Sequence, residues 1–445
     1  MVVRHNTPRR VTFFVLMVIL ATVTTQVQAA GSLAISSATM SGIYTAGTQV
    51  VFTVKAAEGT GSVDLGNVAV TVTLDGWHDI KASVARHTFS TLDVSFTPTA
   101  AGWYLCEATL EGDPKSTARA GILVDPEKIE PSVSAPSDLK QFWDKRRSAL
   151  DETPLKAELT PVESPESQFK CFSVELPCSQ TDAVRGYYAC PADIALHDRP
   201  AILYLRAAGV SGDWCKASPQ NAISLAKQYD AIVLDINAHG MLNGQPAQYY
   251  EDLEQQGLRS YWTQGQDNAD EFYFVGMYVR LLRAIEFIAA QEAWDGKHLI
   301  TLGESQGGGQ ALAAAGLDSR VSAVVAMVPA MCDFTGPVAE RLGGWPQPLG
   351  KDAKNESAQK IIEAVRYCDN VHLAAWSKAN TLIFVGLADM TCPAPGVVAT
   401  YNQLPGEKWI VAYPHKPHNG LPEEDLWLGD IATLQDQFIH RHIGR

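Results

Sequence analysis

Ser305 is the residue whose surroundings point most clearly to chemistry. It lies at the centre of Gly303-Glu304-Ser305-Gln306-Gly307, between a short apolar run at 298–302 and a run of small residues at 308–315. A strand, a sharp turn and a helix in this order predict a nucleophile elbow, and the turn needs glycines because it leaves no room for a Cβ atom. We predict that Ser305 is a nucleophile and that the following helix dipole faces a developing oxyanion. A glycine-rich helix start with an idle serine is the alternative.

A serine hydroxyl needs a base within hydrogen-bond reach and an acid that orients this base. After a nucleophile elbow, the acid and then the histidine come later in the chain, each on a loop behind a strand. Asp389 follows an apolar run at 381–385, and His415 and His418 both follow a later apolar run. Asp333, behind the first strand after the elbow, is an alternative acid. Spacing alone does not choose between the two histidines.

Apolar runs alternate with helical patterns from about residue 138 onwards. The runs lie at 201–205, 231–235, 298–302, 321–328, 381–385 and 408–413, and the helices expected around them include 138–150 and 274–291. Runs that are apolar throughout are typical of parallel strands buried on both faces. The alternation predicts an α/β fold with a doubly wound, mainly parallel sheet, the α/β-hydrolase fold that carries a nucleophile elbow. Two longer stretches, 238–270 and 337–374, follow strands at the edge where such sheets bind ligands.

The first part of the chain has a different pattern. Short alternating runs separated by turns occupy about 30–125, with no helical stretch between them. Strands at this spacing predict a small all-β immunoglobulin-like sandwich. We expect it to pack on the catalytic domain as a spacer, the alternative being a glycan- or partner-binding appendage. Residues 126–137 hold three prolines and predict a linker, which leaves 138–445 for the α/β-hydrolase domain.

Residues 1–29 have the pattern of a signal peptide. Arginines are followed by an apolar stretch at 11–23 and by Val27-Gln28-Ala29, a small-x-small cleavage site. The stretch is short for a membrane span, so we expect a secreted or periplasmic protein with no membrane span in the mature chain, an uncleaved anchor being the alternative. The formal net charge of −14, with no lysine/arginine block, argues against nucleic acid as a partner.

Eight cysteines are scattered along the chain. They fit disulfides in an oxidising compartment, and free buried thiols equally well. Cys171 and Cys178 are the pair to test first, because they are close in sequence near a strand. No two cysteines form a C-x-x-C pair, so we expect no metal site. The chemistry of a serine nucleophile needs no organic cofactor either.

Several segments resemble carbohydrate esterase family 7, the acetyl xylan esterases and cephalosporin C deacetylases. The resemblance covers about 130–440. It rests on Pro136-Ser137-Asp138-Leu139-Lys140-Gln141-Phe142-Trp143, the elbow with glutamine after serine, Val328-Pro329-Ala330-Met331-Cys332-Asp333-Phe334, Gly386-Leu387-Ala388-Asp389-Met390-Thr391-Cys392-Pro393, Tyr401-Asn402, and Tyr413-Pro414 with His418. It implies an esterase with Ser305, Asp389 and His418 as its triad. It also implies that Asp333 and Cys332 are structural.

Three segments depart from the family pattern. The H-G-Y loop of the family is Arg206-Ala207-Ala208 here, R-G-Q is Asn237-Ala238-His239-Gly240, and His-Glu is His418-Asn419. If the first loop is shaped alike, the backbone N–H of Ala208 replaces the tyrosine N–H in the oxyanion hole, with the N–H of Gln306 as second donor. As substrate-binding residues we predict Arg206, His239, Tyr261 and Trp262. For His239, a pocket-shaping or structural role is the alternative.

These features together predict a secreted serine esterase that removes acetyl groups from xylan or xylo-oligosaccharides. Its partner is an acetylated oligo- or polysaccharide, and the sequence leaves the preferred sugar and the oligomeric state open. A second candidate is a secreted serine peptidase of the prolyl-oligopeptidase type, which shares the sheet and the triad order. We find neither its usual propeller nor an anchor for a peptide amino terminus. A third candidate is a non-catalytic glycan-binding protein.

Overall fold

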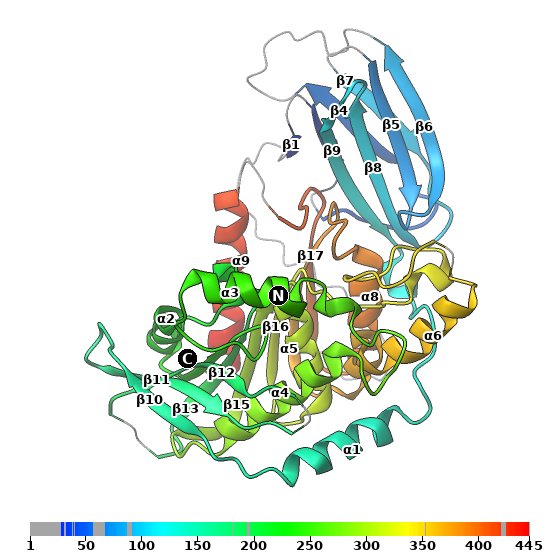
Figure 1. The fold of residues 1–445 in the computed structure, drawn as a ribbon. Helices are drawn as coiled ribbons and strands as arrows, with labels where there is room; N and C mark the ends of the chain where they lie inside the picture. Colours follow the sequence, from blue (N-terminus) through cyan, green and yellow to red (C-terminus); the bar gives the residue numbers. More distant parts are fainter. Residues whose placement is uncertain are drawn as a thin grey trace.

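The computed structural model describes residues 28–30, 33–37, 39, 41–56, 67–86, 91–179, 181–193, 196–351, 353–419 and 424–444. They form an all-β module that stands on one end of a larger α/β domain (Figure 1). Of the expected signal peptide, residues 1–27 lie outside the described residues. A search of the described helices finds none that is long and apolar enough to cross a membrane.

Two sheets build the all-β module, with strand orders β1-β2-β4-β7 and β3-β9-β8-β5-β6. The strands are β1 Gln28–Ala30, β2 Leu33–Ser37, β3 Ile43–Tyr44, β4 Val50–Ala56, β5 Asn67–Leu74, β6 His78–Arg86, β7 Thr91–Phe96, β8 Gly102–Leu110 and β9 Asp113–Val124. In β5, Val68, Val70 and Val72 are buried between more exposed neighbours, so this sheet turns one face to a core shared with the other sheet. Five alternating runs of the sequence, at 49–54, 68–74, 92–96, 102–108 and 118–124, correspond to β4, β5, β7, β8 and β9. The remaining strands have no such run.

Nine strands form the central sheet of the α/β domain, in the order β10-β11-β12-β14-β13-β15-β16-β17-β18. They are β10 Glu158–Val162, β11 Phe169–Leu176, β12 Val184–Pro191, β13 Arg199–Leu205, β14 Ile232–Ile236, β15 Trp294–Glu304, β16 Ala323–Met327, β17 Asn380–Gly386 and β18 Lys408–Tyr413. All pairs from β14 to β18 are parallel, whereas β10, β11 and β12 join the β14 edge in antiparallel fashion. The predicted doubly wound, mainly parallel sheet is confirmed.

Helices cover both faces of this sheet, which explains why its strands are apolar throughout. On one face, α2 Pro219–Tyr229 and α9 Glu424–Ile443 pack with strand residues such as Ile202. On the other face, residues such as Leu203 pack with the larger group of helices, α1 Leu139–Asp151, α4 Tyr273–Ala289, α5 Gln306–Leu317, α6 Glu356–Val365, α7 Asn370–Leu373 and α8 Ala394–Gln403. Successive side chains of a strand point to opposite faces, so neighbouring residues of β13 enter different cores.

The strand order reverses beside β13. From β13 the chain passes through α2 to β14 on one side, and then through α4 to β15 on the other side. Open α/β sheets bind ligands at such a switch point, beyond the carboxyl ends of the strands. β15 ends immediately before Ser305, and β13 ends immediately before Arg206. The fold thus places the elbow and the predicted oxyanion loop at neighbouring strand ends.

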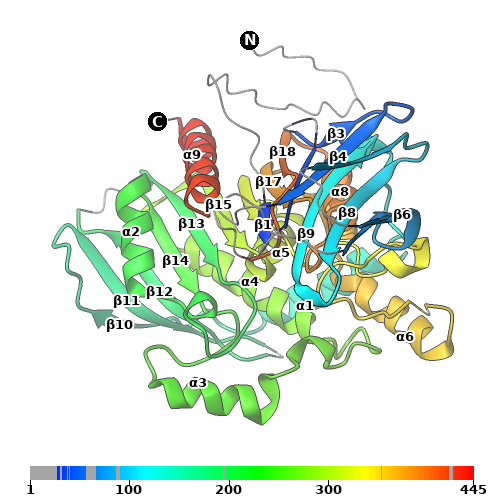
Figure 2. The ribbon, with the colours of Figure 1, turned by 90° about the horizontal axis from the view of Figure 1, so that it is seen from above.

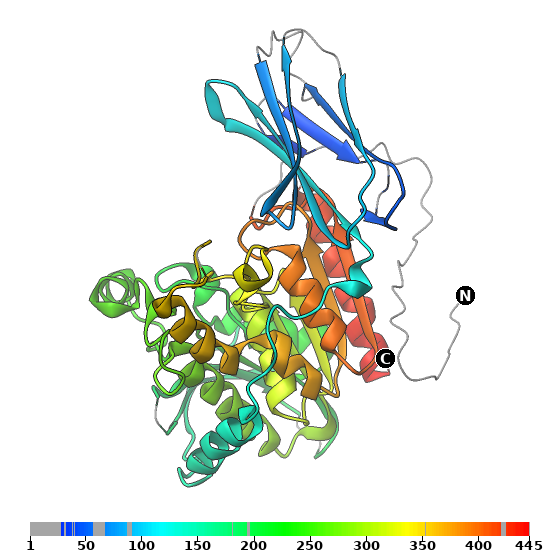
Figure 3. The same cartoon turned by 90° about the vertical axis from the view of Figure 1, so that its right-hand side faces the viewer.

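The connection between the two parts is bound to the α/β domain along its length. A short 3₁₀ helix, Pro126–Lys128, starts it. The side-chain amide of Asn402 donates to the carbonyl oxygens of Pro126 and Ile129, both at 2.9 Å, and Arg341 donates to the carbonyl of Glu130. Two further views place the all-β module beside β17, β18 and α8 (Figures 2 and 3). The segment predicted as a linker is therefore held in place.

Candidate active site

Ser305 lies in the turn between β15 and α5, with φ 55° and ψ −119°, a conformation that few residues other than glycine adopt. A Cβ atom on Gly303 would lie 2.4 Å from the backbone of Gly307, and one on Gly307 would lie 2.1 Å from the carbonyl oxygen of Leu205. Such approaches are sterically forbidden, so only glycine lets strand, turn and helix pack together here. The turn has the geometry of a nucleophile elbow, with its strain held by the packing around it.

This packing predicts that Gly307→Ala destabilises the protein. Overpacking of this kind costs about 1–3 kcal/mol, which corresponds to a fall in Tm of several degrees. Thermal unfolding followed by circular dichroism measures the effect. Gly350→Ala is the matched control, because a Cβ atom there meets nothing within 4 Å. Equal Tm values for the two variants would contradict the close packing of the elbow.

Three side chains from separate loops, those of Ser305, His418 and Asp389, form one chain of hydrogen bonds. Nε2 of His418 lies 2.9 Å from Oγ of Ser305, and Nδ1 of His418 lies 2.7 Å from Oδ2 of Asp389. Asp389 is fully buried, and its Oδ1 accepts the backbone N–H groups of Thr391 and Cys392, each at 2.8 Å. The carboxylate is fixed through one oxygen and faces the imidazole with the other. This is the arrangement in which an acid orients a general base.

The structure places the two competing residues differently. Asp333 is buried; its Oδ1 accepts the backbone N–H of Ser132 at 3.1 Å, and its Oδ2 lies 2.7 Å from the guanidinium of Arg341. It therefore joins the connecting segment to the domain. Burial lowers the pKa of His415 to about 4, and it is His418 that lies against Ser305. Asp389 and His418 are thus the acid and histidine brought to the elbow.

Asp389, Cys392 and His418 each offer one possible metal-ligand atom, and these atoms lie within 4.8 Å of one another. Burial raises the pKa of the Cys392 thiol well above its usual value, so the thiol stays protonated and is a poor ligand. Both oxygens of Asp389 already accept hydrogen bonds. The donor set suits proton transfer between Ser305 and His418 better than metal binding.

All eight cysteines lie among the described residues, and all are free thiols. Cys171 and Cys178, the pair to test first, are not joined. Cys171 lies within β11, whose extended chain runs on to Leu176. At about 3.3 Å per residue, the strand carries the chain well beyond the Cα spacing of about 7 Å that a disulfide tolerates.

Two backbone amides border the elbow. Gln306 is the first residue of α5, where N–H groups have no partner within the helix. Within the described part of the chain, neither its N–H nor that of Ala208 donates to a protein acceptor. The carbonyl oxygen of Ala208 accepts the indole N–H of Trp214 at 2.8 Å. The next residue, Gly209, has φ 130°, a value that favours glycine.

Two of the predicted substrate-binding residues are engaged with the protein. The guanidinium of Arg206 donates to both carboxylate oxygens of the fully buried Asp235, through Nε at 2.8 Å and through a second nitrogen. His239 is buried; Nε2 donates to the carbonyl of Gly209 at 3.0 Å, and Nδ1 accepts the hydroxyl of Tyr273 at 2.7 Å. Burial and nearby Arg280 lower the pKa of His239 to about 3, so the imidazole is neutral. Both side chains brace the loop that follows β13.

Aromatic residues gather beside the elbow. Tyr261 is buried, and its hydroxyl donates to the side-chain oxygen of Gln306. Trp262 is partly exposed, and its ring lies 5.9 Å from that of Trp345. Trp345 and Trp214 were not among the residues predicted from the sequence. Trp345 belongs to the stretch 337–374 that was expected near the ligand site, so an aromatic search there would have found it.

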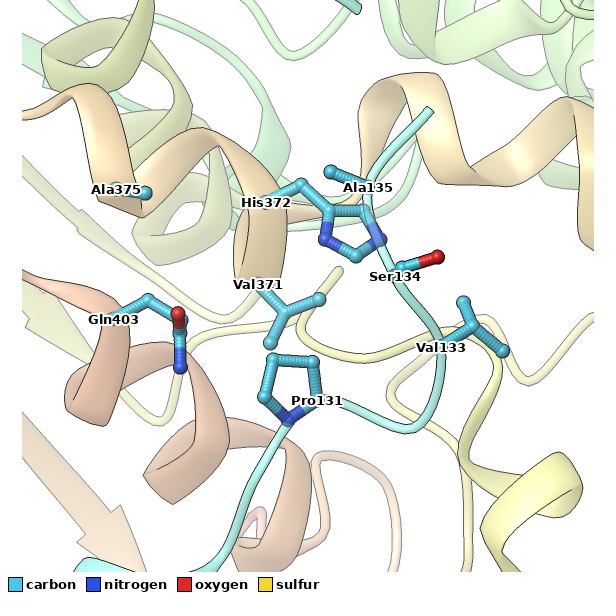
Figure 4. Close-up of a pocket in the computed structure, with 8 residues that line it drawn as sticks. All are labelled: Pro131, Val133, Ser134, Ala135, Val371, His372, Ala375 and Gln403. Atoms are coloured by element: carbon cyan, nitrogen blue, oxygen red, sulfur yellow. The ribbon is translucent and has the colours of Figure 1, made fainter. Parts of the chain in front are cut away.

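Two cavities lie away from this site. One, of about 310 Å³, is formed where the connecting segment passes α7 and the end of α8 (Figure 4). It is lined by Pro131, Val133, Ser134, Ala135, Val371, His372, Ala375 and Gln403. The second, of about 280 Å³, lies between α1 and α4. Neither is lined by a predicted site residue, so neither is the catalytic pocket.

Comparison with known proteins places the α/β domain in a family. Residues 125–425 match the family model of acetyl xylan esterase (AXE1), starting where the all-β module ends. The chain belongs to this family. The resemblance to carbohydrate esterase family 7 is thereby confirmed, and the protein is a carboxylic ester hydrolase.

Individual relatives and solved structures are similar to this chain. The acetyl esterase Axe7A of Xylanibacter ruminicola is 26% identical over 326 residues, which cover 72% of this chain and 72% of that protein. The acetyl xylan esterase of Paenibacillus sp. R4 is 25% identical with a TM-score of 0.56, covering 69% of this chain and 98% of that one. Acetyl xylan esterase 1 of Thermoanaerobacterium sp. JW/SL YS485 shares the fold at 21% identity, with a TM-score of 0.58 and coverage of 71% and 97%.

Proposed function

We propose that this protein is a secreted serine esterase that removes acetyl groups from acetylated carbohydrates such as xylan or xylo-oligosaccharides. The observation that carries the proposal is the contact of Ser305 Oγ with His418 Nε2 at 2.9 Å, continued to Asp389 Oδ2 at 2.7 Å. The relatives named acetyl esterase and acetyl xylan esterase supply the substrate class.

The signal-peptide pattern at 1–29 supports secretion or a periplasmic location. Two facing sheets support an immunoglobulin-like sandwich at 30–125.

Catalysis begins with attack of Ser305 Oγ on the acetyl carbonyl carbon. Nε2 of His418 takes the hydroxyl proton, while Asp389 holds the imidazole tautomer and stabilises its charged form. In the tetrahedral intermediate, negative charge resides on the former carbonyl oxygen. We assign its stabilisation to the N–H groups of Gln306 and Ala208, where loss of one donor typically costs about a hundred- to a thousandfold in kcat.

The intermediate collapses when the bond to the sugar oxygen breaks. His418 gives its proton to this oxygen, the deacetylated sugar leaves, and the acetyl group remains on Ser305. A water molecule then attacks the acetyl carbonyl, and His418 takes one of its protons. Breakdown of the second intermediate releases acetate and returns the proton to Ser305 Oγ.

We assign Arg206 and His239 a supporting role in this reaction. Arg206 is paired with Asp235, and His239 holds the carbonyl of Gly209, next to the proposed donor Ala208. Tyr261 acts on the other donor residue through its bond to the side chain of Gln306. Among the four residues predicted to bind substrate, Trp262 has the exposed surface that such a contact needs.

Trp214 is a further surface for the sugar, because the residue is 64% exposed while its indole N–H is bound to the carbonyl oxygen of Ala208. We expect Trp214→Ala to raise the KM for acetylated xylo-oligosaccharides about five- to tenfold, as a lost aromatic contact is typically worth about 1 kcal/mol. Steady-state kinetics with these sugars and with p-nitrophenyl acetate measure this. Trp214→Phe keeps an aromatic ring but loses the N–H, so it separates the effect of the ring from that of the bond to Ala208. Trp376→Ala, at another exposed tryptophan, is the control variant. An unchanged sugar KM in Trp214→Ala would contradict the role.

The substrate class is tested by measuring acetate release from acetylated xylan and acetylated xylo-oligosaccharides, with hydrolysis of a dipeptide amide measured in parallel. We expect turnover of the acetylated sugars, no measurable amide cleavage, and no activity in Ser305→Ala. Faster cleavage of the amide would point instead to a serine peptidase. Activity on p-nitrophenyl acetate without any on the acetylated sugars would contradict the carbohydrate assignment.

A further inference from the structure

The all-β module packs on the α/β domain through one face of its five-stranded sheet. Along β8 and β9, alternate side chains divide between two cores. Tyr104, Cys106 and Ile122 belong to the core of the module. Trp103, Leu105 and Leu123 belong to the large core of the α/β domain. Because the sheet contributes to both cores, the module is a docked part of the enzyme.

The centre of this interface touches the loop that carries Asp389. Trp103 is fully buried, and its indole N–H donates to the carbonyl oxygen of Leu387 at 2.8 Å. Leu387 lies two residues before Asp389. A Cβ atom on Gly121 would lie 1.9 Å from the same carbonyl oxygen, so β9 approaches this loop as closely as a backbone can.

The loop that carries His418 is held by the same strand. The backbone N–H of Gly121 donates to the carbonyl oxygen of Pro414 at 2.8 Å, four residues before His418. A Cβ atom on Gly42, in the module, would lie 2.9 Å from side-chain atoms of both Leu387 and Pro414. The two loops also bind each other, through the N–H of Leu387 and the carbonyl of Tyr413 at 2.9 Å. The module thus contacts both loops at the point where they meet.

A third contact reaches the stretch that carries Trp345. The carbonyl oxygen of Asp75, in the β5–β6 turn, accepts the backbone N–H of Leu342 at 3.0 Å. The Asp75 carboxylate in turn accepts the backbone N–H of Trp103 at 2.7 Å. Trp103 therefore links the contact with the loop that carries Asp389 to the contact with Leu342, three residues before Trp345.

We propose that the all-β module is a positioning element of the active site. Through Trp103 and Gly121 it holds the loops of Asp389 and His418 in the relative position that their hydrogen bond needs. The proposal rests on the proposed triad. A triad works only while its hydrogen bonds keep their geometry within about 0.5 Å, and loops keep such geometry only when the surrounding structure fixes them. The family match begins at residue 125, so Trp103 and Gly121 lie outside the matched region.

The test compares Trp103→Phe with Trp143→Phe in the full-length protein. Trp143 is also buried and donates its indole N–H to a backbone carbonyl, that of Tyr367 at 2.9 Å, but it lies on α1. For Trp103→Phe we expect kcat per active site for p-nitrophenyl acetate to fall about tenfold, with KM changed less than twofold. The number of active sites is taken from the folded fraction measured by circular dichroism, so a loss of folded protein does not imitate the effect.

A pH profile separates positioning from general damage. Asp389 stabilises the imidazolium of His418, so a loosened contact moves the acid limb of the kcat/KM profile to lower pH. We expect this shift in Trp103→Phe and not in Trp143→Phe. Equal kcat values and equal acid limbs in the two variants would overturn the proposal.

Native-state hydrogen exchange of the unaltered protein gives a second test, which needs no variant to fold. In rising guanidinium, the hydrogen-bonded amides of Leu387, Ala388 and Lys416 are expected to lose protection together with those of β8 and β9. Loops that stay protected after the module has opened would overturn the proposal. Activity that persists in Ser305→Ala would instead show that the proposed triad fails.

Discussion

Ser305→Ala is expected to lower kcat for acetate release by about a millionfold, the loss seen when a triad nucleophile is removed. The alanine has no atom that can form the acetyl-enzyme, although the oxyanion donors and the substrate contacts remain. Initial rates with p-nitrophenyl acetate and with an acetylated xylo-oligosaccharide measure the loss. Alanine occupies almost the same backbone space, so circular dichroism and thermal unfolding are expected to match those of the unaltered protein.

A Ser305→Ala preparation that keeps more than about 1% of the original rate, with contaminating esterase excluded, would remove Ser305 from the mechanism. A variant that loses activity together with its fold would be uninformative by itself. Ser305→Cys then serves as a second variant, because it keeps a nucleophilic atom in a side chain of similar shape. It is expected to form an acyl-enzyme that can be detected by mass.

His418→Ala is expected to cause a loss of similar size, because the members of a triad act as a unit. His415→Ala, three residues earlier in the same loop, is the matched control. His415 is largely buried, and burial lowers its pKa to about 4, so it acts as a neutral packing residue. Its replacement is expected to lower Tm while kcat stays within a few-fold of the original value.

The histidine pair is measured by the same initial-rate assay, normalised to the folded fraction. Added imidazole is expected to restore part of the activity of His418→Ala, since it supplies the missing base in the space left by the side chain. A larger kcat loss in His415→Ala than in His418→Ala would reverse the assignment of the base.

The elbow and the parallel strands of the α/β sheet could be predicted from the sequence because both leave a strong local signal. The strands of the sheet are buried on two faces and therefore apolar throughout. Gly303 and Gly307 mark a turn in which a Cβ atom would collide with the backbone. Asp389 could be placed because it follows a strand at the expected distance. The choice of His418 over His415 came from the family resemblance, and only the structure shows which ring meets Ser305.

Long-range pairing is the part that the sequence could not supply. Arg206 and His239 were predicted to face substrate, but their partners Asp235 and Tyr273 lie 29 and 34 residues away in the sequence. No local pattern indicates such pairs. Free and paired cysteines look alike in sequence, so only the structure shows that Cys171 and Cys178 are free thiols.

The sequence of β8 contains a signal for the docking of the all-β module on the α/β domain. Residues 102–106 of β8 are all buried, whereas a strand with one face in solvent alternates between buried and exposed residues. Gly102-Trp103-Tyr104-Leu105-Cys106 is a continuous run of this kind. A strand buried on both faces within a two-sheet module must face a third layer, and here this layer is the α/β domain.

Labelling with a fluorophosphonate tests the central claim most directly. The reagent reacts with a serine only where a base and an oxyanion hole activate it, so the site of modification identifies the nucleophile. We predict one label per chain, located on Ser305 by peptide mass spectrometry, with activity lost in proportion to labelling and almost no labelling in His418→Ala. Complete inhibition with the label on another residue, or full activity after Ser305 is labelled, would contradict the account.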